Sequence, residues 1–456
     1  MTSEQQVRSF KSRTLGATCL MLVFVLPVPL NAERPVNAER PAGFGQRWVR
    51  THPLTIMGLT QSPKLFKFSQ YKAAGMNSLL AWKHHQELMT EVTDEKYPIH
   101  VNFNDAELND DLKAQIRALH EDATGPLGIL IRDEPKTIAM PGVAKILQWI
   151  RSEYPETLVY SNAYPKGAGG KKYYGRAPDK PYGYGDYLND FATIIRPDVL
   201  MFDVYPFRGD SGVSSVYFQN LANVREEAQR IGVPYWFFVQ SAPTTGARFP
   251  SESELRMQVF SSLAYGFTGM AYFTYDLAFA RGLLDPDGSP NELYQAATRV
   301  NHEVSKIGQS LRFLKSAHVW YIPGYTKRDG QRVDNPLVGG LHNWDKQHGE
   351  KWGIDGIRVL EPGENRDVLI GLFTDDEERR YFMAVNLWSG PNASADKHTT
   401  SIEIQFATEV STLSRLSRET GAVEQLALEN GVLKLSLPGG TGDLFAVGED
   451  DFPGQE

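Results

Sequence analysis

The chain has 456 residues, of which 41% are hydrophobic, and a formal net charge of −8. This length is sufficient for two or three domains with a large buried core. The acidic balance argues against binding to nucleic acid or to anionic membranes, and it favours neutral or cationic small substrates.

The first 38 residues have the pattern of a signal peptide and linker. Three basic residues between positions 8 and 13 precede an apolar run over 15–30, and alanines at 32 and 38 close the segment. Pro27 and Pro29 interrupt this run, which is already shorter than the roughly 20 residues of a membrane span. We therefore expect a secreted or periplasmic protein with no membrane span after cleavage. The single cysteine, Cys19, lies in this segment, so the mature chain has neither a disulfide nor a thiolate.

Short apolar runs alternate with longer amphipathic segments from residue 53 to residue 311. Most of the runs are continuously apolar, as in parallel strands that are buried on both faces. Eight such units predict a (β/α)8 barrel, and the absence of a glycine-rich phosphate loop after any run disfavours a doubly wound open sheet. The expected strands are 54–59, 78–82, 99–103, 128–132, 158–161, 199–204, 235–239 and 270–274, and the expected helices include 105–120, 143–151, 218–230 and 252–265, the last with a capping box at its start.

Beyond residue 311 the chain changes to short runs of Val, Ile, Leu and Phe that are separated by turn residues. The expected strands are 318–322, 357–360, 368–373, 381–387, 400–406 and 432–437, and alternation is clear in 401–406, where every second residue is apolar. This pattern predicts an antiparallel β-sandwich. The expected domains are thus a signal peptide and linker over 1–38, a barrel over 44–312, a sandwich over 317–448 and a frayed acidic tail over 449–456.

The fourth expected strand ends in Arg132, Asp133, Glu134 and Pro135. Reactive groups of such barrels lie at the carboxyl ends of the strands. Cleavage of a glycosidic bond needs a carboxylic acid that protonates the leaving oxygen and, in most enzymes, a second carboxylate. Apolar and aromatic neighbours would raise the pKa of Glu134 towards the working range, so Glu134 is the expected general acid.

The second carboxylate is expected at Asp203, which ends the sixth run between aromatic residues. Asp203 has an alternative role as an acceptor for a sugar hydroxyl. Asp276, at the end of the eighth run, is more typical of a substrate ligand than of a catalyst. The other strand ends carry hydrogen-bonding groups and rings that suit a polyhydroxylated sugar. The expected substrate-binding residues are Arg132, Trp82, His84, Asn104, Asp133, Asn162, Tyr164, Tyr205, Gln240, Tyr275 and Asp276.

No metal or organic cofactor is implied, because no ligand cluster or phosphate cradle is present in the pattern. The consecutive His84 and His85 seldom point at one ion. An insertion over 166–187, rich in Gly, Tyr and Lys, is either a mobile lid with stacking rings or a disordered loop. The sequence gives no prediction of the oligomeric state.

These motifs resemble those of the clan A glycoside hydrolases, especially the family 42 β-galactosidase-like branch. Asp133-Glu134-Pro135 is similar to the Asn-Glu-Pro that ends the fourth strand in that clan, where the glutamate is the acid/base. The stretch 248–273, with Arg248-Phe249-Pro250 and Leu263-Ala264-Tyr265-Gly266, looks like the segment that leads into the eighth strand of that branch. The clan's nucleophile is a glutamate at the end of the seventh strand, where this chain has Gln240. A neutral amide cannot form a glycosyl ester, so the retaining mechanism does not carry over.

Three functions remain open. In the first, Glu134 donates the proton and Asp203 activates water, which favours inversion. In the second, Asp133 and Glu134 act on an N-acetylated sugar as in the substrate-assisted hexosaminidases, with Asp133 orienting the acetamido group. In the third, the barrel binds carbohydrate without cleaving it.

Overall fold

The computed structural model describes residues 43–93, 95–244, 246–277, 280–448 and 451–455. The predicted signal segment, with Cys19, lies outside these ranges. Within them, no helix combines the length and the apolar character that a membrane crossing requires.

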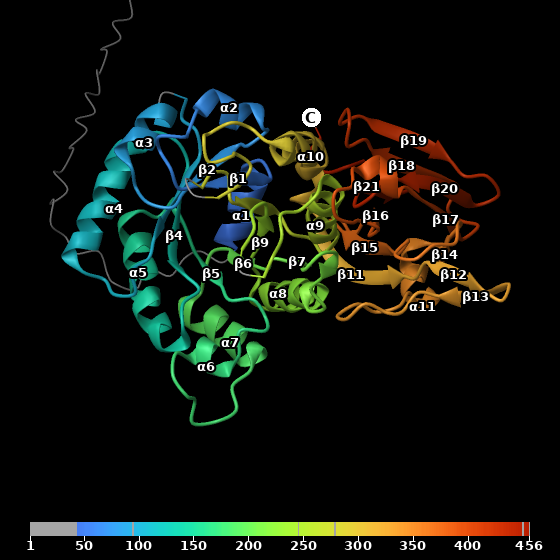
Figure 1. The fold of residues 1–456 in the computed structure, drawn as a ribbon, viewed down its shortest axis with the longest axis horizontal. Coiled ribbons are helices and arrows are strands. Elements are labelled where there is room, and N and C mark those ends of the chain that lie inside the picture. Colours follow the sequence, from blue (N-terminus) through green and yellow to red (C-terminus); the bar gives the residue numbers. More distant parts are fainter. Residues whose placement is uncertain (1–42, 94, 245, 278–279, 449–450, 456) are drawn as a thin grey trace, which may run out of the picture.

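Eight parallel strands form a closed barrel in the order β1-β10-β9-β6-β5-β4-β3-β2 (Figure 1). Each expected strand of the first region is present and differs by at most two residues at either end. The barrel strands are β1 (Thr55–Thr60), β2 (Ser78–Ala81), β3 (Ile99–Phe103), β4 (Leu127–Asp133), β5 (Leu158–Ala163), β6 (Leu200–Asp203), β9 (Tyr235–Gln240) and β10 (Gly269–Phe273). A short hairpin of β7 (Phe207–Arg208) and β8 (Gly212–Val213) follows β6.

Helices connect the strands and cover the outside of the barrel, and α1 closes its amino end. Trp48 and Val49 of α1 pack on the inward-facing side chains of the strands, among them Leu130 and Trp236. The helices are α1 (Phe44–Thr51), α2 (Phe68–Ala73), α3 (Gln86–Thr93), α4 (Asp110–Asp122), α5 (Met140–Glu153), α6 (Gly170–Tyr174), α7 (Tyr184–Asp190), α8 (Tyr217–Ile231), α9 (Glu252–Ala264) and α10 (Glu292–Leu311). The expected capping box is present, because Ser251 accepts from the Glu254 N–H and Glu254 accepts from the Ser251 N–H.

The second region contains antiparallel sheets, as the alternating pattern predicts. A six-stranded sheet has the order β11-β15-β16-β21-β18-β19, and a three-stranded sheet has the order β14-β17-β20. Side chains from both sheets share one hydrophobic core, in which the ring centres of Phe382 in β16 and Phe406 in β17 are 6.0 Å apart. The elements are β11 (Lys315–Ile322), β12 (Tyr325–Arg328), β13 (Gln331–Asp334), α11 (Lys346–Gly349), β14 (Ile354–Val359), β15 (Val368–Thr374), β16 (Arg380–Asn386), β17 (Thr400–Phe406), β18 (Thr412–Leu416), β19 (Val423–Ala427), β20 (Val432–Leu437) and β21 (Gly442–Val447).

Helix α9 joins the two regions, since it packs on the barrel and on the six-stranded sheet. Residues 253–264 of this helix are all buried. At Gly371 of β15, a Cβ atom would lie 2.2 Å from the carbonyl oxygen of Ala264, so this close approach requires glycine. Arg256 of α9 donates to the hydroxyl of Thr441, just before β21, at 3.3 Å in a buried contact. The two regions therefore share a buried polar contact as well as an apolar one.

The acidic tail differs from its prediction in the part that the structure describes. Phe452 is 3% exposed and packs on Tyr381, and the Asp451 carbonyl accepts from the Tyr381 hydroxyl at 2.9 Å. An aromatic anchor of this kind outweighs the fraying expected from the acidic composition.

Candidate active site

The end of β4 has an irregular backbone that turns Glu134 out of the strand. The pairing with β5 shifts register between Leu130 and Asp133. Arg132 and Glu134 have φ values of 63° and 45°. Left-handed backbone is unfavourable for such residues and tends to persist where the surroundings enforce it, often at functional sites. Here the Glu134 N–H donates to the Asn162 carbonyl at 2.9 Å, which fixes the turn to β5.

Asn162 at the end of β5 links the two aspartates predicted for the site. Its Nδ2 atom donates to Oδ1 of Asp133 and to Oδ1 of Asp203, both at 2.9 Å. The two carboxylate oxygens are therefore no farther apart than twice this distance. Strands β4, β5 and β6 are neighbours in the barrel, which brings together three of the residues expected from sequence alone.

The three carboxyl groups hold protons more tightly than isolated carboxyls do. Burial, then Asp203 and then Asp133 raise the pKa of Glu134 to about 8, while Lys172 lowers it. Burial and then Asp133 raise the pKa of Asp203 to about 7, and burial raises the pKa of Asp133. Because the groups titrate together, these values belong to the cluster. At neutral pH the cluster retains a proton, and Glu134 binds it most strongly.

Glu134 is also accessible to a ligand. Its side chain is 27% exposed, whereas Asp203 is buried at 8% exposure. A partly exposed acid beside a buried one is the arrangement expected for a proton donor with a fixed second carboxylate.

Tyrosines surround this cluster. Burial and the neighbouring Glu134 raise the pKa of Tyr164 to about 12. Tyr187 donates from its hydroxyl to the Pro135 carbonyl at 3.2 Å and accepts from the Tyr164 N–H at 3.1 Å. Tyr205 lies close enough to Asp203 for that carboxylate to contribute to raising its pKa. The hydroxyl of Tyr184 is buried and has no hydrogen-bond partner among the described residues.

Three of these contributors were not predicted as site residues: Lys172, Tyr184 and Tyr187. All lie in the insertion over 166–187, which contains α6 and most of α7 and is therefore not a plain disordered loop. Lys172 places its Nζ atom 4.0 Å from Oε2 of Glu134 and 4.8 Å from the ring centre of Tyr164. The abundance of Tyr and Lys in this segment was the available signal.

Other predicted residues support the end of β4 or β3. The Arg132 guanidinium donates to the backbone carbonyl of Asn104 at 2.7 Å. The Asp133 N–H donates to Oδ1 of the Asn104 side chain at 3.3 Å. Both bonds attach the end of β4 to the residue that follows β3. The Trp82 carbonyl accepts from Asn102 at 3.2 Å, and the Trp82 ring is half-buried against the inner core of the barrel.

The structure corrects the role predicted for Gln240. Its side chain is fully buried, with Oε1 accepting from the Phe207 N–H at 3.1 Å and Nε2 donating to the Arg248 carbonyl at 2.5 Å. These bonds hold the segments that follow β6 and β9, so the amide is not directed at a substrate.

Tyr275, Asp276 and His84 are also engaged elsewhere. Tyr275 is fully buried and packs on Tyr71, with the two ring centres 4.8 Å apart. Oδ1 of Asp276 accepts from the backbone N–H groups of Gln61 and Ser62, both at 2.9 Å. His84 lies 3.1 Å from Asp122 at the end of α4. The structure shows packing and local hydrogen bonds for these three side chains, and their contact with a substrate stays a prediction.

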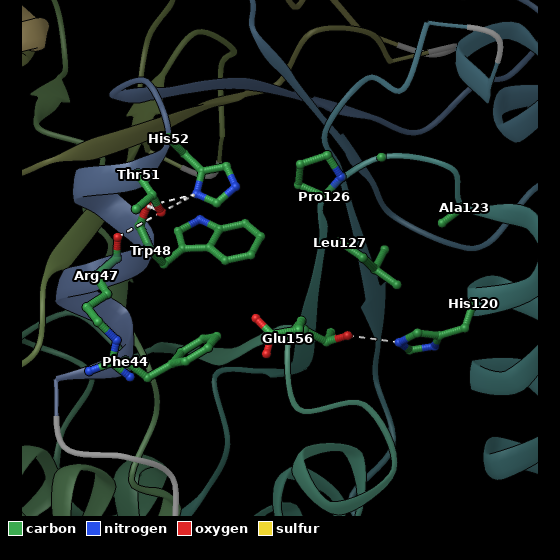
Figure 2. A pocket seen from close by; sticks show the side chains of 12 residues that line it. Phe44, Arg47, Trp48, Thr51, His52, His120, Ala123, Pro126, Leu127 and Glu156 are labelled. Atoms are coloured by element: carbon green, nitrogen blue, oxygen red, sulfur yellow. Dashed lines mark hydrogen bonds between the residues drawn. The ribbon is translucent and has the colours of Figure 1, made fainter. Parts of the chain in front are cut away.

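Two further observations concern ligands. No group of three potential metal-ligating side chains occurs in the described ranges. A cavity lies at the amino end of the barrel, where Trp48 of α1 and His52, which follows α1, face Pro126 and Leu127 (Figure 2). This cavity adjoins the start of β4, whereas Glu134 follows its end, and the amino face of such barrels serves stability rather than catalysis.

Comparisons with known proteins give only weak similarities. No protein-family profile matches the chain, and no curated protein sequence matches it. Among solved structures, the chain is similar to an α-galactosidase from Saccharomyces cerevisiae with raffinose, at 8% identity and a TM-score of 0.45 over 89% of this chain and 99% of the other. It is similar to an endo-β-1,4-mannanase from Thermotoga petrophila, at 10% identity and a TM-score of 0.38 over 88% and 98%. A chitinase domain from Pyrococcus furiosus gives 10% identity and a TM-score of 0.37 over 54% and 93%. At these values the likeness carries no argument about activity, which must rest on the site itself.

Proposed function

We propose that this protein is a glycoside hydrolase that cleaves O-glycosidic bonds of an oligosaccharide or polysaccharide. One observation supports this most: Glu134 is partly exposed, its pKa is raised to about 8, and it lies beside Asp203, whose pKa is raised to about 7. Glu134 enters the reaction protonated and donates its proton to the leaving oxygen. Asp203 is the second carboxylate, and it activates water once ionised.

Asn162 has a positioning role in this mechanism. By donating to Asp133 and Asp203 together, it holds these two carboxylates close to each other. Its hydrogen bonds also lower the pKa of each aspartate, which favours the ionised form that a base requires.

A substrate-assisted reaction on N-acetylated sugars is the second candidate. The observation that favours it is the fixed Asp133, adjacent to the acid and oriented by Asn162. In that mechanism Glu134 keeps its role, and Asp133 orients the acetamido group that attacks the anomeric carbon. The third candidate, binding without cleavage, gives no reason for a protonated acid beside a second carboxylate.

The proposal also includes the location of the protein, the type of its second domain and its family. We infer secretion or a periplasmic location from the signal-like pattern over 1–38. We interpret the two sheets with a common core as the predicted β-sandwich. The resemblance to the family 42 branch stays a prediction.

The test is a screen of the protein against plant and algal polysaccharides and N-acetylated glycans, with the anomer of the released sugar followed by NMR. We expect cleavage by the wild type, and we expect Glu134→Gln to lose about 10²–10⁴-fold in kcat. Glu156→Gln is the matched control, since Glu156 lines the cavity at the opposite end of the barrel. Release of the inverted anomer supports Asp203 as base, whereas retention with N-acetylated substrates alone supports the second candidate. If the wild type releases no sugar from any glycan that it binds, the hydrolase proposal is wrong.

A further inference from the structure

The insertion beside Glu134 is basic although the whole protein is acidic. Residues 166–187 contain five basic and two acidic side chains, a local net charge of +3 against −8 for the chain. Four of the five basic residues of this segment are exposed, and Lys136, two residues after Glu134, is exposed as well. The exposed basic side chains are Lys136, Lys171, Lys172, Arg176 and Lys180. A charged patch at the rim of a site attracts ligands of the opposite sign.

Lys172 is the member of this patch closest to the acid. Its ammonium lies 4.0 Å from Glu134 and 4.8 Å above the Tyr164 ring, while its side chain stays 55% exposed. Burial and the neighbouring Asp203 and Asp133 raise the pKa of Glu134, which favours its neutral form and weakens it as a counter-charge for Lys172. An exposed ammonium next to a neutral acid is available to an anionic group of a ligand.

The position of Lys172 is fixed by its neighbours rather than by its own contacts. The hydroxyl of Tyr173 accepts from the N–H groups of Gly167 and Ala168 at 2.9 and 3.0 Å, and it donates to the Pro165 carbonyl at 3.0 Å. Tyr173 is 2% exposed and stacks on Tyr187 at 5.0 Å. Helix α6 is thereby attached to the wall of the site, and the adjacent lysine is held at the rim beside the acid.

Asp133 and Asp203 also lie close enough to Lys172 for its charge to lower their pKa values, but both side chains are less exposed to solvent than the lysine. Asp203 is buried, and it shares the donor Asn162 with Asp133 on the inner side of the cluster. Asp179 and Asp186 of the insertion are exposed as well, and they offset part of the positive charge, which leaves the net +3 given above. The local charge thus reverses the preference for neutral or cationic substrates that the net charge suggests.

We propose that the substrate is an anionic glycan, with carboxylate or sulfate groups on the sugars that flank the cleaved bond, and that Lys172 contacts one of these groups. The inference rests on the proposed function, because it takes Glu134 as the point of cleavage. The other basic residues of the insertion supply a field that attracts the chain and are not required to contact it.

Binding is measured by isothermal titration calorimetry with Glu134→Gln, which prevents turnover. The probes are an oligogalacturonate, a sulfated galactan oligosaccharide and a neutral galactan oligosaccharide of equal length. We expect at least one anionic probe to bind about tenfold more tightly than the neutral one, with an advantage that shrinks at high salt. The comparison of the first two probes distinguishes carboxylate from sulfate.

The role of Lys172 is tested by adding Lys172→Met to this background, with Lys434→Met as the matched control. Lys434 is exposed on β20, so the control removes the same charge from the second region. We expect Lys172→Met to weaken anionic binding about tenfold and to leave neutral binding unchanged, and we expect Lys434→Met to change neither by more than about twofold. Thermal unfolding followed by circular dichroism verifies that each variant is folded.

The outcomes separate this inference from the proposed function. Equal binding of neutral and anionic probes, or equal effects of the two lysine substitutions, overturns the inference. Cleavage of neutral glycans by the wild type would then still support the hydrolase. Conversely, selective anionic binding that depends on Lys172, without cleavage of any glycan by the wild type, supports the binding site and refutes the hydrolase.

Discussion

The two halves of the barrel mouth use their polar side chains in opposite ways. At the ends of β4, β5 and β6, the carboxyl groups of Asp133, Glu134 and Asp203 lie together and their pKa values are raised. At the ends of β9 and β10, Gln240 and Asp276 are fully buried. Gln240 accepts from one backbone group and donates to another, and Asp276 accepts from backbone N–H groups. The first half retains electrostatic repulsion among three carboxyl groups. In the second half, called the satisfied half below, Gln240 bonds through both of its side-chain polar atoms and Oδ1 of Asp276 accepts two bonds, while Oδ2 of Asp276 is buried without a partner among the described residues.

This difference indicates where chemistry is possible. Groups held in an unfavourable ionisation state are available for proton transfer, whereas satisfied buried groups stabilise the loops that they bind. The position that holds the nucleophile in the clan that this chain resembles falls in the satisfied half. The proposed reaction is accordingly confined to β4–β6, and substitutions in the two halves should have different consequences.

The largest expected effect is that of Asp203→Asn. We expect a loss of about 10³-fold in kcat, because an amide cannot activate water. In the wild type we expect activity to fall below about pH 7, where Asp203 becomes protonated, and this fall should be absent from the variant. The loss of activity above about pH 8 should move to lower pH, since the charge on Asp203 no longer raises the pKa of Glu134.

This prediction is checked with the pH profile of kcat on the best substrate from the screen. Asp210→Asn is the control, because Asp210 is exposed in the β7–β8 hairpin. A profile that stays unchanged in Asp203→Asn would remove Asp203 from the mechanism.

Gln240→Glu tests the satisfied half. The new carboxylate would keep the bond from the Phe207 N–H but face the Arg248 carbonyl without a proton to donate. We expect the free energy of unfolding to fall by about 2–4 kcal/mol at pH 8. The loss should be smaller at pH 5, because the buried acid has a raised pKa and contributes stability only while it is protonated.

Urea unfolding at the two pH values measures this effect, and kcat per folded molecule is measured alongside. Activity per folded molecule should stay close to that of the wild type. A gain in turnover, or a covalent glycosyl intermediate seen by mass spectrometry, would show that position 240 reaches the substrate.

Asn162→Ala should have a moderate effect on the reactive half. Without the shared donor, the pKa values of Asp133 and Asp203 rise, because the Asn162 hydrogen bond lowers both. We expect about a tenfold loss of kcat and a shift of the acidic limb of the pH profile to higher pH. Asn104→Ala serves as the comparison, since Asn104 also supports the end of β4 but bonds to the Asp133 backbone. A fall in kcat with no shift of the acidic limb would mean that Asn162 acts only on the local fold.

Asp276→Asn should have the smallest effect, with kcat within about twofold of the wild type. Burial raises the pKa of Asp276 to about 6, although the bonds from Gln61 and Ser62 lower it. A raised pKa means that the wild type loses stability as pH rises through about 6, and the asparagine variant lacks this loss. The variant should thus gain about 2–3 kcal/mol relative to the wild type between pH 4 and pH 7.5, as measured by urea unfolding. A loss of activity larger than tenfold would place Asp276 in the reaction.

Much of the fold was predictable because local patterns determine it. Continuous apolar runs predicted all eight barrel strands, and Ile99–Phe103 and Thr400–Phe406 have the predicted ends. Strands β12, β13, β18, β19 and β21 were missed. Residues 331–334 and 423–427 are mostly exposed or half-exposed, so their pattern lacks the burial signal from which strands are inferred.

The sequence alone determined which strand ends carry acids, because the chain order of apolar runs and polar residues is local information. It therefore identified Glu134, Asp133, Asp203 and Asn162. Only the tertiary structure decided that Gln240 and Asp276 turn to the backbone and that Lys172 reaches the acid. The physical reason is that direction and partner depend on contacts between distant segments, such as Gln240 with Phe207, which no local pattern encodes.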